Sequence, residues 1–529
     1  MKILVAEPLA PAALELLQAQ AGWNVVVADP KTYQPHLADC DALLVRSAVK
    51  VTREVLGAAP KLRVIGRAGV GVDNVDLPAA TEAGVLVMNT PGGNAISVAE
   101  HTLALMLSMA RAVPQASVST KSGKWEKKKF LGNELRGKTL GVIGLGSIGR
   151  EVVRRAKPFQ MRIVGHDPYV SSQSASGLGV ELMSLAELYA QSDYVTLHVA
   201  LTPETDRMLN AAAFEQMKPG VRIVNCARGE LIDEQALHAA ITNGKVSGAG
   251  LDVFLKEPPG ANLLFELEHV IATPHIAGST EEAQEIVGIR IVEQVVEYLK
   301  SGVALNAVNM PALTPEQYRT LKPYVTLAER LGLFLSHIAI GNAHTIRFVY
   351  FGRLAEQNTQ ILRNAALSGV LGRSLEYRAN VVNAMQIATQ RGFRVVEQLE
   401  PGRLHMDSIR MELETESGAV SVLGAVVLDK PRLLQVEDIS CEATLHGNLM
   451  YSRSQDVPGV IGYLGTVLGK NGVNIANFAL GRQEENETRK SGEVLIAISI
   501  IETDQPVPDA VISQLFENPA VKFVRRVVL

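Results

Sequence analysis

The stretch TLGVIGLGSIGREVVRRAKPFQMRIVGHD, residues 139–167, decides the fold of the central part of the chain. A short apolar run leads into three glycines, Gly144, Gly146 and Gly149, and a helix-like segment follows them. A second apolar run then ends at Asp167. This order of strand, glycine turn, helix, strand and acid predicts a dinucleotide-binding unit. A glycine turn in another kind of α/β protein is the alternative.

Each part of this stretch has a physical role. Gly144 permits the tight turn, Gly146 lets the backbone approach a pyrophosphate, and Gly149 lets the helix lie close to the strand. The N-terminus of the helix offers unpaired N–H groups to the phosphates. Asp167 follows Gly149 by 18 residues, where a carboxylate can accept hydrogen bonds from the ribose hydroxyls. The same carboxylate would repel the 2′-phosphate of NADP, so the sequence favours NAD.

Size and composition narrow the class of protein. A chain of 529 residues is long enough for about three or four domains, and 47% hydrophobic residues can fill their cores. The net charge of −4 gives no general attraction to nucleic acid or membranes. Glu7 interrupts the first apolar run too early for a signal peptide, and the most apolar stretch, 331–340, is too short to span a bilayer.

The cysteines are few and widely spaced. Cys40, Cys226 and Cys441 form neither a disulfide framework nor a metal-binding motif, and no other cluster of metal ligands is visible. This usage is typical of a reducing cytoplasm, which we take as the expected location.

The first part of the chain alternates strand and helix patterns, which predicts a parallel sheet with helices on its faces. The expected strands are 3–6, 25–27, 42–45, 62–65 and 85–88. A second glycine turn, Gly66, Gly69 and Gly71, is expected to present N–H groups to an anion. Polar side chains follow the strands at the sheet edge where ligands bind, with solvated loops as the alternative. They are Arg46, Ser47, Arg67 and Asn94.

A second sheet surrounds the glycine fingerprint, with further expected strands at 194–198, 222–225, 249–253 and 270–273. A helix over 96–112 leaves the first sheet, and one over 281–299 can return to it. The first domain should therefore be discontinuous, with a ligand cleft between the two sheets. The basic segment 125–130 is interpreted as a solvated loop, with a subunit contact or an arm over a phosphate as alternatives.

The last third of the chain has a different character. Residues 345–351 and 393–445 are strand-like, and 356–370 and 378–390 are helix-like, without a chemical motif. We interpret this part of the chain as serving binding or assembly. From Gly447 to Leu529 the order strand, helix, strand, strand, helix, strand predicts a small ferredoxin-like unit.

Three residues at strand ends could form a catalytic set. His275 is suited to take a hydroxyl proton at neutral pH, and Glu257 could fix its tautomer. Arg228 offers a planar partner for a substrate carboxylate. A structural ion pair for Arg228 and a loop position for His275 are the alternatives.

Several motifs resemble those of the D-isomer-specific 2-hydroxyacid dehydrogenases. The motifs are NCARG at 225–229, LDVF at 251–254, EPP at 257–259 and PH at 274–275. Others resemble the long-form branch of this family that acts on 3-phosphoglycerate. They are VRS at 45–47, GRAGVGVDNVD at 66–76, NTP at 89–91, GN at 93–94 and GKWE at 123–126.

The resemblance implies an α/β fold with two doubly wound parallel-sheet domains, followed by an α+β intervening domain and a ferredoxin-like ACT domain. The implied boundaries are 1–97 with 282–316 for a discontinuous substrate-binding domain, 98–281 for a Rossmann NAD-binding domain, 317–446 for an intervening domain of the allosteric substrate-binding type, and 447–529 for an ACT regulatory domain.

The resemblance also implies oxidation of 3-phosphoglycerate to 3-phosphohydroxypyruvate with NAD, the first step of L-serine biosynthesis. Arg228 would bind the substrate, His275 would be the acid–base group, and Glu257 would support His275. Substrate phosphate would meet Arg46, Ser47 and Arg67, with Asn94 nearby. The implied cofactor-binding residues are Val70, Gly144, Gly146, Ser147, Ile148, Gly149, Asp167, Val199, Cys226, Ala227, Arg228, Asp252, His275 and Gly278.

In this family the ACT domain binds serine between subunits, which implies a homotetramer or homodimer. Asp456 and Asn474 match positions used for serine, but Ser454 stands where some relatives have a histidine. A purely oligomerising module is the alternative to serine control. For the whole chain, a hydroxypyruvate or glyoxylate reductase and a non-catalytic NAD-sensing protein are the competing hypotheses.

Overall fold

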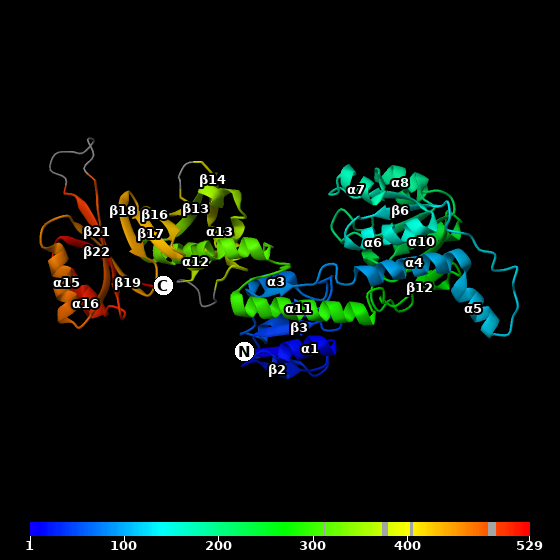
Figure 1. The fold of residues 1–529 in the computed structure, drawn as a ribbon, viewed down its shortest axis with the longest axis horizontal. Coiled ribbons are helices and arrows are strands. Elements are labelled where there is room, and N and C mark those ends of the chain that lie inside the picture. The colour runs from blue at the N-terminus through cyan, green and yellow to red at the C-terminus, as the bar shows by residue number, and fades with distance from the viewer. Residues whose placement is uncertain (312, 373–378, 403–405, 485–493) are drawn as a thin grey trace.

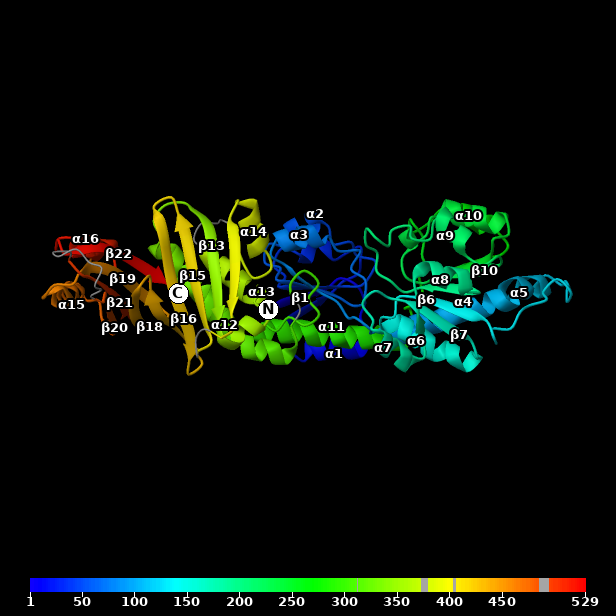
Figure 2. The ribbon, with the colours of Figure 1, turned by 90° about the horizontal axis from the view of Figure 1, so that it is seen from above.

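The computed structural model describes residues 1–311, 313–372, 379–402, 406–484 and 494–529. Four sheets follow one another along an elongated molecule (Figures 1 and 2). The N-terminal sheet lies between the sheet of the glycine fingerprint on one side and the two C-terminal sheets on the other. The order along the molecule therefore differs from the order along the chain.

The first sheet is parallel and has the strand order β2-β1-β3-β4-β5. Alternate residues of its first strand enter different cores, since Ile3 packs toward α1 and α11 while Leu4 packs on the opposite face. Both faces are thus covered, as expected for a parallel sheet. The elements are β1 (Lys2–Val5), α1 (Pro11–Gln18), β2 (Asn24–Val27), β3 (Ala42–Val45), α2 (Arg53–Gly57), β4 (Val64–Arg67), α3 (Leu77–Glu82) and β5 (Leu86–Met88).

One prediction about this sheet is wrong. Gly66 was expected in a turn, but it lies inside β4, which ends only at Arg67. A Cβ on Gly66 would come within 2.9 Å of Ile291 on α11, so the glycine serves close packing against that helix. The strand was placed too early because Leu62 belongs to the core without belonging to the strand.

The second sheet has the strand order β12-β11-β10-β9-β6-β7-β8, and all its strands are parallel. The chain enters this unit through α4, and α11 after it packs against the first sheet. The elements are α4 (Ala95–Arg111), α5 (Val113–Lys121), β6 (Thr139–Ile143), α6 (Ser147–Ala156), β7 (Arg162–His166), α7 (Ser172–Leu178), β8 (Glu181–Leu182), α8 (Leu185–Gln191), β9 (Tyr194–Leu197), α9 (Ala211–Gln216), β10 (Val221–Asn225), α10 (Glu234–Thr242), β11 (Val246–Leu251), β12 (Val270–Ala272) and α11 (Glu281–Ser301).

The third sheet has the order β14-β13-β15-β16-β17-β18 and is antiparallel except for the β13–β14 pair. Its long helix α12 was not predicted, and the helix expected over 378–390 begins only at Ala384. Residues 373–378 lie outside the described residues. The elements are α12 (Pro315–Ile338), β13 (Ala343–Phe351), α13 (Gln360–Leu371), α14 (Ala384–Gln390), β14 (Arg394–Glu400), β15 (Ser408–Thr415), β16 (Gly418–Val427), β17 (Lys430–Val436) and β18 (Ile439–Thr444).

The fourth sheet is antiparallel with the order β20-β21-β19-β22 and two helices on one face, which is the predicted ferredoxin-like arrangement. Its other face shares a core with the third unit, where Tyr451 meets Phe334 of α12 edge to face at 5.9 Å. The elements are β19 (Asn448–Gln455), α15 (Val460–Lys470), β20 (Ile475–Arg482), β21 (Ile496–Thr503), α16 (Asp509–Leu515) and β22 (Val521–Val528).

Within the described residues, no single helix is both long and apolar enough to cross a bilayer. Helices α4 and α5 reach that composition only as a pair, and the pair is bent by 62°.

Candidate active site

The carboxyl ends of the second sheet gather most of the predicted site residues. In a parallel sheet these ends share one edge, and the edge nearest the change in strand order is where cofactors bind. That change falls at β6, whose neighbours are β7 on one side and β9 on the other. The glycine fingerprint follows β6 directly, so it lies at this switch point.

The three fingerprint glycines are required for different reasons. Gly144 has φ +93°, and a Cβ there would lie 2.4 Å from the His198 carbonyl oxygen. A Cβ on Gly149 would lie 2.0 Å from the Gly144 carbonyl oxygen, so α6 could not approach the turn. Nothing lies within 4 Å of a Cβ on Gly146, which leaves open space where α6 begins. Such a cradle fits the pyrophosphate of a dinucleotide.

The fingerprint loop is fixed from behind through the backbone of Leu145. Its N–H donates to Asp167 Oδ2 at 2.8 Å, and its carbonyl accepts from Arg150 Nε at 2.9 Å. The other oxygen of Asp167 accepts from the Tyr169 N–H at 2.9 Å. Each carboxylate oxygen keeps a lone pair for a further donor, so Asp167 can both shape the loop and receive a ribose hydroxyl.

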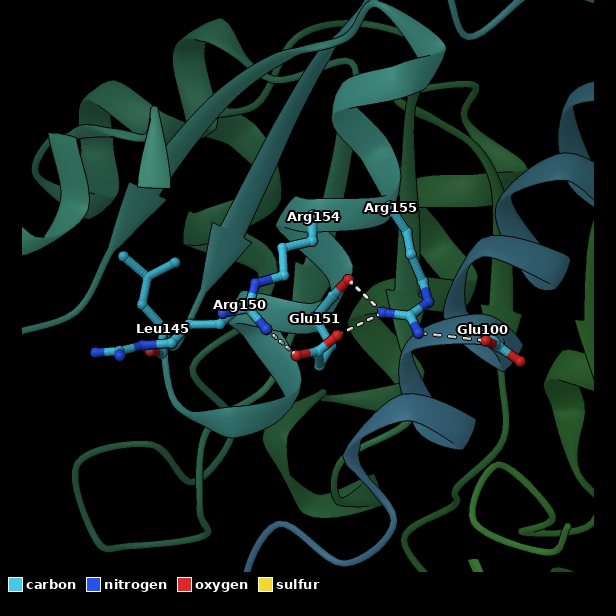
Figure 3. A network of polar contacts seen from close by, with 6 residues as sticks. All are labelled: Glu100, Leu145, Arg150, Glu151, Arg154 and Arg155. Carbon is cyan, nitrogen blue, oxygen red and sulfur yellow. Dashed lines mark hydrogen bonds and ion pairs between the residues drawn. The ribbon is translucent and has the colours of Figure 1, made fainter. Parts of the chain in front are cut away.

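A network of charged side chains ties α6 to α4 (Figure 3). Arg155 donates to Glu151 Oε2 at 2.5 Å and reaches Glu100 on α4 at 3.3 Å, while Arg154 pairs with Glu151 from the other side. The hydrogen bond from Arg155 lowers the pKa of Glu151, which keeps this carboxylate ionised. The helix that presents the fingerprint is thereby held to the neighbouring helix.

His275 and Glu257, for which an acid–base role is predicted, are in direct contact. His275 Nδ1 lies 2.7 Å from Glu257 Oε2, and Glu257 Oε1 accepts from the Phe254 N–H at 3.1 Å. The hydrogen bond to Glu257 raises the pKa of His275 above its ordinary value. Burial works to raise the pKa of Glu257, but the hydrogen bond and charge of His275 bring it below its ordinary value. The pair therefore favours imidazolium beside carboxylate.

A buried carboxylate positions His275. Asp252 is fully buried, and its oxygens accept from the Thr273 hydroxyl at 2.5 Å and from the N–H groups of Ile276 at 2.9 Å and Ala277 at 2.8 Å. These bonds hold the loop in which His275 adopts a left-handed backbone, φ +55°. A non-glycine residue in that region persists only when its surroundings hold it there.

His101 of α4 completes this arrangement. Its Nε2 lies 3.0 Å from the Thr273 hydroxyl and 3.5 Å from Asp252. Burial works to raise the pKa of Asp252, yet the hydrogen bonds from His101 and Thr273 lower it. Sequence reasoning missed His101 and Thr273, because no motif joins residues so far apart in the chain. A direct contact between Asp252 and the cofactor stays a prediction.

Arg228 bridges the two sheets. Its Nη2 lies 2.8 Å from Asp73 of the first unit, and its Nη1 donates to the Ala227 carbonyl at 2.7 Å. A Cβ on Gly71 would lie 2.0 Å from Arg228 Nη2, so this glycine makes room for the guanidinium. The positive charge of Arg228 also acts on His275, where it works to lower the pKa. Arg228 is thus near enough to the His275–Glu257 pair to act on its charge, and the catalytic roles of the three residues stay predictions.

Arg67 is close enough to two other arginines to be influenced by their charge. Burial is the largest cause of the lowered pKa of Arg67, and the charges of Arg228 and Arg46 also lower it, while Asp73 and Glu7 act in the opposite direction. Such crowding of like charges favours an anionic ligand. Within the described residues, the buried Arg67 Nε and Asn94 Oδ1 have no hydrogen-bond partner in the protein, which also indicates a ligand. Arg46 is half-buried, and Ser47 is exposed after β3.

The remaining predicted cofactor contacts line the same edge. Val199 lies beside the Gly144 turn, exposed Ser147 faces Gly92, and Gly278 lies against Asn94. The Val70 carbonyl accepts from Asn89 at 2.5 Å. Direct contacts of all these residues with NAD stay predictions, as do those of Ile148, Cys226 and Ala227.

Two groups in this region are chemically inert. Burial raises the pKa of the Cys226 thiol to about 12, so it does not supply a thiolate. Burial also lowers the pKa of His198 to about 3, so its imidazole is neutral. Among the residues that the structure describes, no group of His, Cys, Asp and Glu is arranged to hold a metal ion.

The two predicted effector residues are not brought together. Asp456 follows the end of β19 and accepts from Arg482 Nε at 2.7 Å, whereas Asn474 precedes β20 and donates to Asp504 at 2.8 Å. Since β19 and β20 run in the same direction on either side of β21, these residues lie at opposite ends of the sheet. Ser454 is buried within β19.

Comparison with known proteins gives consistent matches. The family described as D-isomer specific 2-hydroxyacid dehydrogenase, NAD binding domain, matches residues 103–277. The family described as D-3-phosphoglycerate dehydrogenase intervening domain matches residues 320–437. These matches cover the fingerprint sheet and much of the third unit.

Individual relatives extend the similarity along the chain. D-3-phosphoglycerate dehydrogenase of Methanocaldococcus jannaschii is 43% identical over 99% of both chains. D-3-phosphoglycerate dehydrogenase of Archaeoglobus fulgidus is 41% identical over 96% of both. Among solved structures, D-lactate dehydrogenase from Aquifex aeolicus, complexed with NAD and lactic acid, is 30% identical with a TM-score of 0.52 over 59% of this chain and 100% of that one.

Proposed function

The chain belongs to the D-3-phosphoglycerate dehydrogenases, and on that premise we propose that its cleft oxidises 3-phosphoglycerate to 3-phosphohydroxypyruvate with NAD. The observation that carries this proposal is the His275–Glu257 pair, joined at 2.7 Å beside Arg228. NAD, when bound along the edge that holds the glycine cradle, supplies the hydride acceptor. This reaction is the first step of L-serine biosynthesis.

His275 takes the proton of the substrate hydroxyl. Its Nδ1 is engaged by Glu257, so Nε2 is the nitrogen that faces the reaction. The ionised Glu257 stabilises the imidazolium that forms, and Asp252 keeps the ring in place through the loop backbone. A base positioned in this way contributes on the order of 10²–10⁴ in rate.

Charged groups of the two sheets bind the two ends of the substrate. Arg228 offers a planar fork to the carboxylate next to the reacting carbon, for which it would exchange its contact with Asp73. Arg46, Ser47 and Arg67 receive the phosphate, and their accumulation of positive charge supports this assignment. Asn94 completes the substrate side with an unpaired buried amide oxygen.

The two competing functions have less support. A hydroxypyruvate or glyoxylate reductase needs no phosphate site, yet Arg46 and Ser47 follow β3 and Arg67 ends the neighbouring strand β4. A non-catalytic NAD sensor needs no acid–base pair. One assay separates these functions, in which purified protein receives NAD and 3-phosphoglycerate while a coupled reaction removes the product. NADH formation supports the proposal, and turnover of glyoxylate without turnover of 3-phosphoglycerate would contradict it.

The domain boundaries remain those predicted, with the units at 1–97 and 282–316, 98–281, 317–446 and 447–529. The ferredoxin-like topology of the last unit supports an ACT assignment. If L-serine binds there, Asp456 and Asn474 must come from different subunits, and the Arg482 side chain must leave Asp456. Inhibition of the purified enzyme by L-serine tests this assignment.

The free, buried cysteines suit the proposed cytoplasmic location.

A homo-oligomer is also part of the proposal. The segment from α5 to β6 exposes large apolar side chains, including Val113, Val118, Trp125 and Leu131. Apolar side chains gathered on one projecting segment mark a binding surface. This segment extends away from the rest of the unit in Figure 1, where a second copy can reach it.

A further inference from the structure

The loop after β3, residues 46–49, is organised by a carboxylate from the neighbouring strand. Glu7 follows β1, which lies next to β3 in the sheet, and its side chain is buried. Glu7 Oε1 accepts from the N–H groups of Arg46 at 2.9 Å and Val49 at 2.8 Å, and Oε2 accepts from the Ala48 N–H at 3.1 Å. One carboxylate thus receives three of the four N–H groups of this loop.

An amide holds the same loop by its carbonyl groups. Asn74 Nδ2 donates to the carbonyl oxygens of Arg46 at 2.8 Å and Val49 at 2.7 Å. The Asn74 carbonyl accepts from the Val51 N–H at 2.8 Å, which joins this loop to the one that carries Asp73. Glu7 and Asn74 therefore fix both ends of the loop from opposite sides.

The donors of this loop that Glu7 and Asn74 do not engage are suited to bind an anion. Within the described part of the chain, the Ser47 N–H makes no hydrogen bond, and its side chain is exposed. Among the residues that the structure describes, the Arg46 guanidinium reaches only the Pro8 carbonyl, at 3.5 Å. A backbone N–H, a hydroxyl and a guanidinium at one turn are the donors that a phosphate group uses.

We propose that Glu7 and Asn74 are positioning residues that preorganise loop 46–49 for the phosphate of the substrate. This inference rests on the proposed function, because it assigns the phosphate to Arg46 and Ser47. Holding the loop in its binding conformation before the substrate arrives reduces the cost of ordering it on binding. Glu7 would thus favour an anion although it carries a negative charge itself.

Because Glu7 is itself negatively charged, the direction in which KM changes when Glu7 is neutralised tests the proposal. If Glu7 acted only through its charge, Glu7→Gln would remove a repulsion and tighten phosphate binding. If Glu7 acts as a scaffold, Glu7→Gln weakens binding, because the new amide would point its own donors at the Ala48 N–H. The two roles therefore predict changes of KM in opposite directions.

The experiment measures kcat and KM of Glu7→Gln for 3-phosphohydroxypyruvate and for hydroxypyruvate, which lacks the phosphate. We expect KM for the phosphorylated substrate to rise about tenfold, roughly the value of one lost charge-assisted hydrogen bond, with kcat changed far less. KM for hydroxypyruvate and the Kd for NADH should stay the same. Glu15→Gln, on the exposed surface of α1, is the matched control.

Asn74→Ala provides a second variant in case Glu7→Gln folds poorly. It removes the donor to the Arg46 and Val49 carbonyls without adding a charge, so it should raise the same KM. An unchanged or lower KM in both variants, in an enzyme that still turns over the phosphorylated substrate, would overturn the scaffold while the proposed function stands. A wild-type enzyme that does not distinguish the two substrates would overturn both.

Discussion

His275 combines an unfavourable backbone conformation with a favourable side-chain hydrogen bond to Glu257. The left-handed backbone at φ +55° is held by the hydrogen bonds that Asp252 makes to the next two N–H groups. Its ring meets Glu257, which raises the pKa of the imidazole. A non-glycine residue keeps such a backbone conformation only within a network of this kind.

The raised pKa of His275 predicts a pH dependence. Oxidation needs the neutral imidazole, so the rate should rise as the pH increases through that pKa. Glu257→Gln removes the contact that contributes most to the shift, so the midpoint should move to lower pH while the maximal rate falls. The measurement is kcat/KM for 3-phosphoglycerate across the pH range. A midpoint that stays in place or moves to higher pH would contradict the role of Glu257.

Arg46 offers a prediction about substrate binding. Arg46→Ala should raise KM for 3-phosphoglycerate by about tenfold or more, because a charge-assisted contact with the phosphate is lost. The Kd for NADH should not change, since Arg46 lies on the first sheet. Steady-state kinetics and NADH fluorescence titration provide the two values, and an unchanged KM would place phosphate recognition elsewhere.

At the residue scale, sequence motifs singled out Arg228, Glu257 and His275, whose catalytic roles stay predictions, but not the residues that support them. Arg228, Glu257 and His275 follow three different strands, and their motifs were sufficient to associate them. The roles of His101 and Thr273 could not be predicted, because they arise from the packing of α4 against the sheet edge. Glu7 was noted only for interrupting an apolar run, since its partners become visible only when β1 and β3 are neighbours.

At the scale of elements, substitutions at two glycines of the fingerprint turn should separate the packing of α6 from the binding of the cofactor. Gly149→Ala should destabilise the protein by about 1–3 kcal/mol, because the new methyl group would collide with the Gly144 carbonyl. Gly146→Ala has open space, so it should fold normally and weaken NADH binding by crowding the pyrophosphate. Thermal unfolding and NADH titration of Gly149→Ala and Gly146→Ala test this difference. Equal stability of the two variants would show that α6 can move to make room for the methyl group at position 149.

The elements that were misplaced share a cause. Helix α12 is long, yet only its C-terminal part is strongly apolar, because its other buried positions are spread over a narrow stripe. Before helix α14, the Asn383 side chain accepts from the Asn380 N–H at 2.8 Å and the Asn380 side chain accepts from the Val382 N–H at 2.9 Å, which holds a turn where the pattern suggested helix. The same two side chains donate to the carbonyls of Gly84 and Glu82 in the first unit, and the local pattern does not contain that contact.

At the scale of the whole molecule, the first unit has neighbours on both sides. The contacts of Asn380 and Asn383 lie at the turn before β5, and β5 leads to the loop that carries Asn94. The segment before α12 runs beside β5, where the Val308 N–H donates to the Val87 carbonyl at 2.8 Å. The third unit therefore contacts the turn that leads into β5, the strand whose following loop carries Asn94.

The projecting segment from α5 to β6 predicts the assembly state. Val118→Glu places a charge on a side chain that is 70% exposed, so it should leave folding unchanged and weaken self-association. Sedimentation velocity over a range of concentrations measures this effect. Gln18→Glu, exposed on α1 of the first unit, is a control that adds the same single negative charge outside this segment. A variant that sediments like the wild type would place the subunit contact on another surface.

The most direct test of the central claim follows the hydrogen on the reacting carbon. With 3-phosphoglycerate deuterated at C2, the wild-type enzyme should produce NADH that carries the deuterium, as mass spectrometry would show. His275→Ala should bind NAD normally but form this product at least about 10²-fold more slowly. NADH without deuterium, or an undiminished rate in His275→Ala, would contradict a cleft in which His275 takes the proton while the hydride passes to NAD.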